Sequence, residues 1–367
     1  MTWNWQQPDW PRWHFDAESL AALESAFLLG AGRLMGAWRH LADDERDRLT
    51  VDLLSDEALK TSQIEGELLD RVSVQSSLRR EFGLTADQPS KPAESGIAEM
   101  MVSCFRHFDE PLSHEMLHGW HRLLCRGRND LRVVGAYRSH AEPMQVVSGA
   151  IHRPKVHFEA PPAARMADEM SAFIDWFEAT GAGGRDTLPA LTRAGLAHLY
   201  FVSIHPYEDG NGRIARALCE KALAQALGQP SLLSLSRQIE RERTAYYGAL
   251  AANNRELEVS DWLRWFARAA LDAQAYPAAL IDHLIAKTRL FDRLRGQLNP
   301  RQQKVLLRLF DAGPEGFSDG LSAGNYIALT RASPATARRD LVDLVAKGAL
   351  LRTGERKSTR YWLPAAG

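Results

Sequence analysis

Apolar residues recur at helical spacing along most of the chain. The pattern predicts helices within about 16–84, 94–125 and 163–296, separated or broken where glycine, proline and short polar residues gather. One stretch differs, because Val146-Val147 and Val156-His157-Phe158 flank Ser148-Gly149 and Pro154. That arrangement is typical of a β-hairpin. The sequence therefore predicts a mainly α protein with one small hairpin in its middle.

The first 15 residues hold four tryptophans interleaved with Pro8 and Pro11. Proline in the interior of a helix removes a hydrogen bond and clashes with the preceding turn, so no regular helix is expected here. We expect an extended arm whose indoles are buried against a later part of the chain. A surface platform for an aromatic ligand is the alternative.

The last part of the chain, 299–367, differs in charge from the rest. It carries 11 Lys and Arg against six Asp and Glu, whereas the whole chain of 367 residues has 45 against 46. The pattern predicts a helix over 301–310, a short helix near 326–329, a helix that opens at Ser333-Pro334, and then two strands. This order resembles a winged helix-turn-helix domain.

Composition excludes several classes of protein. A content of 45% hydrophobic and 25% charged residues is that of a folded globular chain. A net charge of −1 gives no overall attraction to nucleic acid, and three cysteines are too few for a disulfide framework. The start resembles no secretory signal, and the apolar stretches look shorter than the roughly 20 residues of a membrane span. We expect a cytoplasmic, soluble protein without a membrane partner.

A possible metal motif lies on the helix that Ser113 would cap. His114, Glu115 and His118 form a literal HExxH, in which two histidines one turn apart can hold Zn²⁺ beside a glutamate base. The apolar stripe Leu117, Trp120 and Leu124 places these histidines, together with His121, on the solvent side. A zinc metalloprotease therefore remains an alternative, without a third ligand at the expected offset.

The segment 205–216, HPYEDGNGRIAR, carries the clearest chemistry. Proline disfavours helix in the residue before it, so one helix should end at His205 and a second should begin near Asn211 or Gly212. The glycine turn between them presents bare N–H groups at a helix N-terminus, which is a ready binding site for an anion. Arg213 and Arg216 share a face of the first turn and can hold further phosphate oxygens.

Two further side chains complete this set. The imidazole of His205 is a natural general base for a hydroxyl nucleophile, and Asp209 is a hard oxygen ligand suited to Mg²⁺ on phosphates. The segment therefore predicts phosphoryl chemistry.

These residues resemble the Fic family motif HPFx(D/E)GNGRxxR, and Tyr207, where Phe is usual, is the departure. Members of that family transfer AMP from ATP to a protein hydroxyl and release pyrophosphate. The resemblance implies the following roles: His205 as base, Asp209 for Mg²⁺, Gly210 and Gly212 for the anion site, Asn211 for the α-phosphate, and Arg213 and Arg216 for the outer phosphates. Gly212 argues against a branch that carries Lys there and phosphorylates instead.

The likeness extends to other segments. Gly135–Arg138 and the hairpin near Met144–Phe158 resemble the family's flap, which binds the target protein by strand addition. Tyr246, Tyr247 and Asn254 resemble its adenine pocket. The resemblance thus implies ATP and Mg²⁺ as substrate and cofactor, and a hydroxyl-bearing target protein as partner.

A second motif lies upstream, at Thr61-Ser-Gln-Ile-Glu65-Gly66. Leu54, Ala58, Thr61, Glu65 and Leu68 form one stripe at helical spacing, which places Glu65 on an apolar face, where a carboxylate needs a cationic partner. The segment resembles the family's inhibitory helix, (S/T)xxxE(G/N). By that resemblance the inhibitory residues are Thr61, Glu65 and Gly66, and the partner of Glu65 is Arg216.

Together these features predict three regions: an N-terminal arm and inhibitory helical region (1–95), a Fic-type catalytic core (96–296) and a winged-helix domain (299–367). The expected function is autoinhibited AMP transfer to proteins. The basic tail supports a second hypothesis, a DNA-binding regulator whose helix 334–347 presents Arg338 and Arg339 to a groove, or a protein contact through the same tail. The sequence leaves open the target, the reverse removal of AMP, and whether the protein is a homodimer.

Overall fold

The computed structural model describes all residues except 1, 87, 149–154, 315, 317–318 and 365–367. The chain divides into two compact units. The first comprises Met1–Gly36 and Arg46–Ala275, and the second comprises Ala37–Glu45 and Tyr276–Gly367. Both are mainly helical, as the sequence predicts, and each has its own hydrophobic core.

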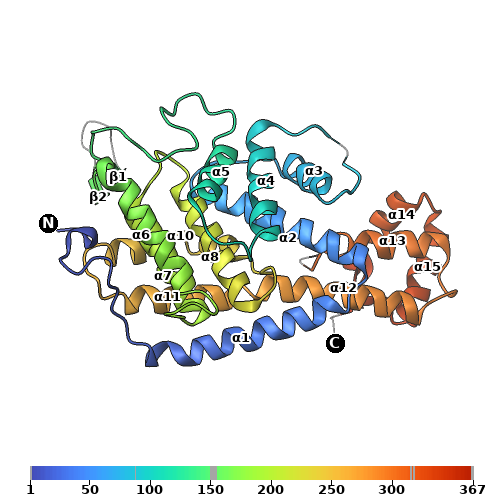
Figure 1. The fold of residues 1–367 in the computed structure, drawn as a ribbon. Helices are drawn as coiled ribbons and strands as arrows, with labels where there is room; N and C mark the ends of the chain where they lie inside the picture. Colours follow the sequence, from blue (N-terminus) through green and yellow to red (C-terminus); the bar gives the residue numbers. More distant parts are fainter. Residues whose placement is uncertain (1, 87, 149–154, 315, 317–318, 365–367) are drawn as a thin grey trace. The chain divides into compact units, whose positions relative to one another are not determined.

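The helices that lie wholly or mostly in the first unit follow in sequence order (Figure 1). They are α1 (Glu18–Arg39), α2 (Asp43–Ile64), α3 (Arg71–Glu81), α4 (Pro92–Arg106), α5 (His114–Leu124), α6 (Met166–Ala179), α7 (Ala190–Ile204), α8 (Asn211–Leu227), α9 (Leu235–Arg241), α10 (Arg243–Ala252) and α11 (Ser260–Asp272). Nearly every residue of α7 is buried, so this helix forms the centre of the unit, and α8 packs closely along it. A helix buried on all sides is a rigid support for whatever stands at its ends.

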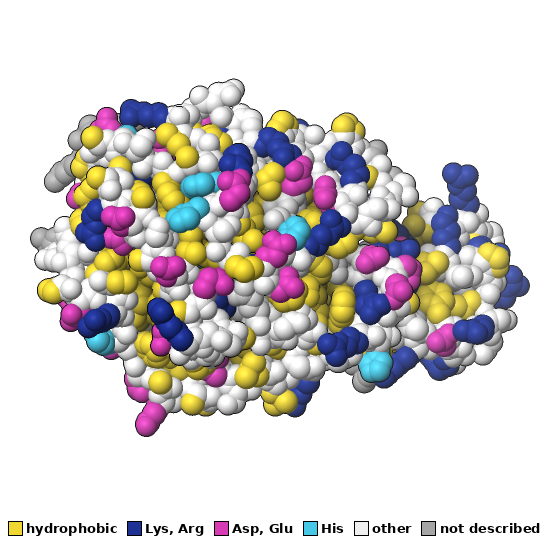
Figure 2. Space-filling model, in the orientation of Figure 1, with side chains coloured by type: hydrophobic (Ala, Val, Ile, Leu, Met, Phe, Trp, Pro, Cys, Tyr) yellow, Lys and Arg dark blue, Asp and Glu magenta, His cyan; other side chains and the backbone are white. Residues whose placement is uncertain are grey.

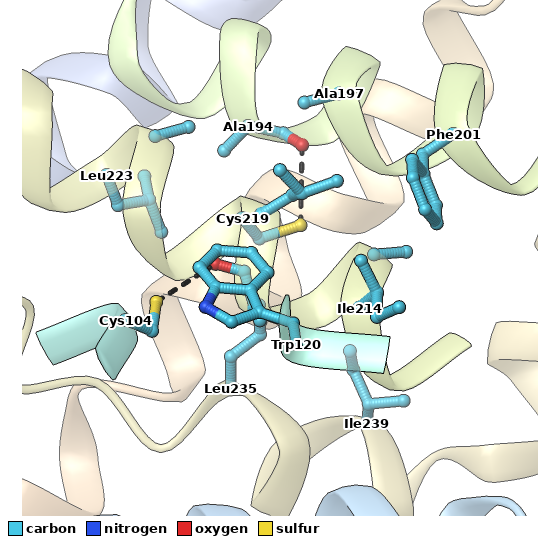
Figure 3. Packing of buried hydrophobic residues seen from close by; sticks show 14 of the residues in the cluster. Cys104, Trp120, Ala194, Ala197, Phe201, Ile214, Cys219, Leu223, Leu235 and Ile239 are labelled. Carbon is cyan, nitrogen blue, oxygen red and sulfur yellow. Dashed lines mark hydrogen bonds between the residues drawn. The ribbon is translucent and has the colours of Figure 1, made fainter. Parts of the chain in front are cut away.

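Side chains from several helices fill the core around α7 and α8. Figure 3 shows Trp120 of α5, Phe201 of α7 and Ile214 of α8 in one cluster. The thiols of Cys104 and Cys219 each donate a hydrogen bond to a helix carbonyl at 3.4 Å, and both are free and buried. These cysteines act as small core residues, so they contribute packing rather than chemistry.

The predicted hairpin forms at the edge of this unit. Strand β1 (Gln145–Ser148) pairs antiparallel with β2 (Lys155–Glu159), with a register shift between Val146 and Val147. The expected turn at 149–154 lies outside the described residues. The N-terminal arm runs beside the hairpin (Figure 1) and includes a short 3₁₀ turn, η1 (Asn4–Gln6). Its tryptophans are buried or partly buried, which confirms an arm held by aromatic packing rather than an open platform.

Helix α1 corrects one expectation from the sequence. By length and composition alone, it is long and apolar enough to cross a membrane, and a third of its most apolar part is buried. One such helix is weak evidence, since core helices of soluble proteins pass the same test. Glu24 in its middle is buried and accepts hydrogen bonds from the N–H groups of Leu191 and Thr192 at the start of α7. A buried carboxylate at a helix N-terminus fits a helix packed against protein.

The second unit has the predicted order of elements. Helix α12 (Ala275–Arg293) is followed by α13 (Pro300–Phe310), α14 (Ala323–Thr330), α15 (Pro334–Ala346), and the antiparallel strands β3 (Leu351–Thr353) and β4 (Arg360–Trp362), with a short η3 turn (Arg356–Ser358) between the strands. Leu321 bridges to Tyr361, which adds one residue pair to the small sheet. Arg338 and Arg339 are exposed on α15.

Whether this unit is a winged helix that binds DNA or protein stays a prediction. On the face drawn in Figure 2, Lys and Arg side chains are interspersed with Asp and Glu, and neither sign forms one continuous field.

Candidate active site

The turn between α7 and α8 builds the site. Helix α7 ends at Ile204, and His205 caps it in the left-handed conformation with φ 51°. Helix α8 begins at Asn211, after Gly210 with φ 81°. Both boundaries are those that the sequence predicts. The left-handed caps reverse the chain within a few residues, so the imidazole and the N–H groups at the start of α8 lie in one short loop.

The side chain of Asn211 holds this loop closed. Its Oδ1 accepts a hydrogen bond from the N–H of Tyr207 at 3.0 Å, and its Nδ2 donates to the carbonyl of Tyr207 at 2.8 Å. The buried Tyr207 hydroxyl lies 3.0 Å from Nδ1 of His118, and the Tyr207 ring stacks on His121 with centroids 4.1 Å apart. The hydroxyl that distinguishes Tyr207 from the usual Phe therefore has a partner.

His205 is neutral at physiological pH. Burial, followed by the nearby Arg138, lowers the pKa of this imidazole to about 4. Arg138 is buried and donates from Nε to the carbonyl of His205 at 2.8 Å and from Nη2 to Pro161 at 2.6 Å. A neutral imidazole fixed at the end of a rigid helix can accept a proton.

The inhibitory segment lies against the second arginine of the motif. Arg216, with a side chain only 1% exposed, donates to Thr61 Oγ1 at 2.7 Å, to the Thr61 carbonyl at 2.9 Å and to Glu65 Oε1 at 2.7 Å. Although burial opposes its charge, Glu65 raises the pKa of the Arg216 guanidinium. Glu65 and Arg216 also flank Gly212, where an added Cβ would collide with Glu65 Oε1.

The first arginine of the motif also has a carboxylate partner. Arg213, with a side chain 6% exposed, pairs with Glu67 at 2.5 Å, and Gly66 with φ +86° stands between the two glutamates. Asp209 accepts from Arg128 Nη1 at 2.7 Å. Although burial works in the opposite direction, Arg213 and Arg128 keep the pKa of Asp209 below its ordinary value.

A cavity of about 480 Å³ opens beside the loop. Its lining includes six of the predicted site residues, namely Glu65, His205, Gly212, Tyr246, Tyr247 and Asn254, together with Val146 and Phe158 of the hairpin. Tyr246 is buried with its hydroxyl 3.1 Å from His198, whereas Tyr247 is 41% exposed at the cavity. Segments far apart in the sequence therefore meet at one cavity, which is of the size that encloses a small-molecule ligand.

Comparisons with known proteins agree with this geometry. Residues 111–223, which contain the whole loop, match the Fic/DOC family. The chain contains a Fic/DOC domain. Residues 3–84 match a second family, described as a domain of unknown function (DUF4172), which takes in the arm and the inhibitory segment.

Two curated relatives match parts of this chain. It is 29% identical over 161 residues to "Protein adenylyltransferase Fic" of Nematostella vectensis, which covers 44% of this chain and 33% of that protein. It is 40% identical over 65 residues to "Uridine 5'-monophosphate transferase" of Xanthomonas campestris pv. campestris (strain 8004), which covers 17% of this chain and 12% of that protein. The chain thus spans a third or less of the length of these relatives.

One solved structure matches over nearly the full length. The crystal structure of a Fic family protein from Desulfovibrio desulfuricans G20 covers 94% of this chain and 97% of its own, with a TM-score of 0.52 and 20% identity. At this identity the likeness concerns the fold.

Two sequence expectations about the Fic/DOC domain and its flank are wrong. Leu68 is 85% exposed, because α2 ends at Ile64 and Gly66 turns the chain away from the helical stripe. His121 is fully buried rather than solvent-facing, because its ring packs under Tyr207 and accepts a hydrogen bond from the N–H of Gly135.

The HExxH segment has another role in this arrangement. His118 contacts the Tyr207 hydroxyl, and Glu115 pairs with Arg122. No cluster of three or more metal-ligating side chains occurs among the residues that the structure describes.

Mg²⁺ and the site's residues are chemically compatible. Asp209 is a partly exposed carboxylate beside the loop, and Mg²⁺ is commonly held by one or two carboxylates while substrate phosphates and water complete its shell. Two buried N–H groups are also available for a ligand. Arg213 Nε and Arg216 Nη1 have no hydrogen-bond partner in the described part of the chain. These groups fit the oxygens of a phosphate chain.

Sequence reasoning missed several residues around the site. Arg138 has no signal in the sequence beyond the likeness of Gly135–Arg138 to the flap, although it donates a hydrogen bond to the carbonyl of His205. Glu67 gave a weak signal, as a second carboxylate two residues after Glu65. Asn4 gave none, since a single polar residue between tryptophans has no spacing that points to a site.

Proposed function

We propose that this Fic/DOC protein transfers AMP from ATP to a hydroxyl group of a target protein. The observation that carries the proposal is the meeting of a neutral His205, the glycine turn at the start of α8, and Tyr246, Tyr247 and Asn254 at one cavity. A general base, an anion site and an aromatic pocket at one cavity suit a nucleotide whose α-phosphate lies beside His205. The name of the Nematostella relative supports the same activity.

The reaction balances with the groups present. The target hydroxyl gives its proton to His205 as its oxygen bonds to the α-phosphorus of ATP. The bond from that phosphorus to the oxygen bridging to the β-phosphate breaks, and pyrophosphate leaves with the electron pair. A general base typically contributes 10²–10⁴-fold to such a rate.

The phosphate chain would be held by this loop and its arginines. N–H groups at the start of α8 lie at the positive end of the helix dipole, and the free Arg213 and Arg216 N–H groups can donate to β- and γ-oxygens. Asp209 is the residue that would hold Mg²⁺, which neutralises charge on the phosphates when bound. We propose that Asn211 fixes the geometry of the loop and thereby determines the position of the α-phosphate.

We further infer that the protein is autoinhibited by its segment 61–67. Glu65 forms an ion pair with Arg216, and Glu67 forms one with Arg213. Glu65 also lies over Gly212 of the anion site. Both phosphate-binding arginines are therefore already neutralised, and a carboxylate occupies the place where like-charged phosphate would come. The adenine ring of ATP can enter the pocket at Tyr246, Tyr247 and Asn254, but the phosphates cannot bind in the position that transfer requires.

The hairpin is the proposed docking place for the target. Val146, Val147 and Val156 are 38%, 49% and 39% exposed on β1 and β2, and the first two line the cavity. A strand edge with exposed valines suits an extended segment of a target that adds to the sheet and presents its hydroxyl to His205.

The product can be identified by mass spectrometry. Purified Glu65→Gly protein is incubated with Mg²⁺, cell lysate and either ATP or UTP, and modified peptides are sequenced. The proposal expects adenylate on Ser, Thr or Tyr with ATP and little product with UTP. Uridylate as the main product would assign the other nucleotide, the one in the name of the Xanthomonas relative, and no nucleotide adduct with either would contradict nucleotidyl transfer.

A further inference from the structure

The N-terminal arm reaches the wall of the nucleotide cavity, far from its own place in the sequence. Trp5 Nε1 donates to the carbonyl of Glu159 on β2 at 2.7 Å, and the Trp3 ring meets Phe158 edge-on at 5.3 Å. The Arg255 guanidinium lies over the Trp3 ring, 4.2 Å from its centroid. The arm is thus fixed to one strand of the hairpin and to the segment after α10.

Asn4, at the centre of this contact, is completely buried. Its N–H donates to the carbonyl of Asn254 at 3.0 Å, and its Nδ2 donates to Ser203 Oγ at 2.8 Å. Its Oδ1 accepts from the N–H of Trp5 at 2.8 Å, so every polar atom of the side chain has a partner. Ser203 and Asn254, the two residues that it joins, both line the cavity.

Both partners of Asn4 lie close to residues of the proposed active site. Ser203 precedes His205 by two residues on the last turn of α7. Asn254 donates from Nδ2 to the carbonyl of His157 on β2 at 3.0 Å, while its Oδ1 is buried and lacks a partner among the described residues. Asn4 therefore connects the end of α7, the segment after α10 and the hairpin into one wall of the cavity. The unpaired Asn254 Oδ1 in that wall is available to accept a hydrogen bond from a ligand.

We propose that Asn4 is a positioning residue of the nucleotide site, and that the arm 3–7 sets nucleotide affinity by holding this wall together. The inference rests on the proposed function. It gives a role to the first residues of the segment 3–84, which matches the domain of unknown function. Asn4 touches no reacting atom. Its loss lets Ser203 and Asn254 move apart, which weakens nucleotide binding while the base and the arginines stay in place.

A double-mutant cycle tests the contact. Asn4→Ala, Ser203→Ala and the double variant are made in the full-length Glu65→Gly protein, and the Mg·ATP dissociation constant is measured by calorimetry alongside kcat and KM. Loss of one neutral hydrogen bond predicts weakening between about twofold and about tenfold, with the two changes less than additive. The KM for ATP should rise by the same factor, and kcat at saturating ATP should stay within about twofold.

A matched control separates positioning from stability. Gln274→Ala also removes a buried amide that donates one hydrogen bond to a backbone carbonyl, that of Phe27, away from the cavity. It should lower the melting temperature as Asn4→Ala does and leave ATP affinity unchanged. Unchanged ATP affinity and KM in folded Asn4→Ala protein would overturn the inference.

The remaining outcomes are also decisive. If Asn4→Ala does not fold, Ser203→Ala breaks the same bond from the other end, and unchanged affinity in that variant overturns the inference. If the Glu65→Gly parent binds ATP and transfers AMP but the cycle shows no coupling, only the role of Asn4 fails. If the parent itself binds no nucleotide, the proposed function fails as well.

Discussion

Replacing Glu65 by glycine should convert a restrained enzyme into an active one. The carboxylate of Glu65, 29% exposed, binds an arginine whose side chain is 1% exposed, at 2.7 Å. Hydrogen bonds to charged groups are worth roughly 1.5–3 kcal/mol, which corresponds to a factor of about 10 to 150 between blocked and open states. Thr61 still holds Arg216 through two hydrogen bonds in the variant, so the guanidinium stays near the anion site.

The substitution should leave the fold intact. Glu65 follows the last residue of α2, so the full cost of about 1 kcal/mol for glycine inside a helix does not apply. The side chain also leaves no cavity in the core, because it reaches over Gly212 toward the nucleotide site. Melting temperature should therefore change little.

The assay is self-labelling with α-labelled ATP. Label on the Glu65→Gly protein should rise one to two orders of magnitude over wild type, and adding Arg216→Ala should abolish it. Glu115→Gly is the control, since it removes a carboxylate that is 79% exposed and lies on α5. Equal labelling of folded wild-type and Glu65→Gly proteins would refute the inhibitory role of this segment.

Four smaller predictions follow from neighbouring contacts. Glu67→Ala should release Arg213 but raise labelling at most about fivefold, because a carboxylate that is 37% exposed forms a pair worth about 1 kcal/mol or less. The base His205 is active when neutral, so kcat/KM should stay flat from pH 8 to about pH 5 and fall only near its lowered pKa of about 4; a fall centred near pH 6.5 would contradict this. Asp209→Asn should raise the Mg²⁺ concentration needed for ATP binding in calorimetry, and unchanged Mg²⁺ dependence would remove its metal role. Tyr207→Phe should keep activity within about twofold and cost about 1 kcal/mol in stability by denaturant unfolding.

Local rules predicted much of the site because its chemistry is concentrated in one short loop. Proline after His205 and glycine at 210 determine where the helices end and begin, and these effects act within a few residues. The pairing of Glu65 with Arg216 was expected from a resemblance, and the two groups lie 2.7 Å apart. Their placement depends on how α2 packs against α8, which no local pattern encodes.

The rest depends on tertiary contacts. Asn4 and Ser203 are 199 residues apart in sequence and share one buried hydrogen bond. Leu68 fits the helical stripe by spacing, yet Gly66 ends that geometry two residues earlier. His121 was expected in solvent because it lies off the apolar stripe of its helix, whereas the ring of Tyr207, from the loop between α7 and α8, covers it. Such outcomes follow from packing between distant segments rather than from propensity.

The central claim is that His205 directs transfer of the α-phosphoryl group with its nucleoside. The most direct test incubates Glu65→Gly protein with ATP labelled at either the α- or the γ-phosphate, with and without His205→Ala. The account predicts protein-bound label from the α position only, one pyrophosphate released per label, and a loss of about 10²–10⁴-fold in His205→Ala with ATP affinity retained. Label from the γ position, or full α-labelling without His205, would contradict it.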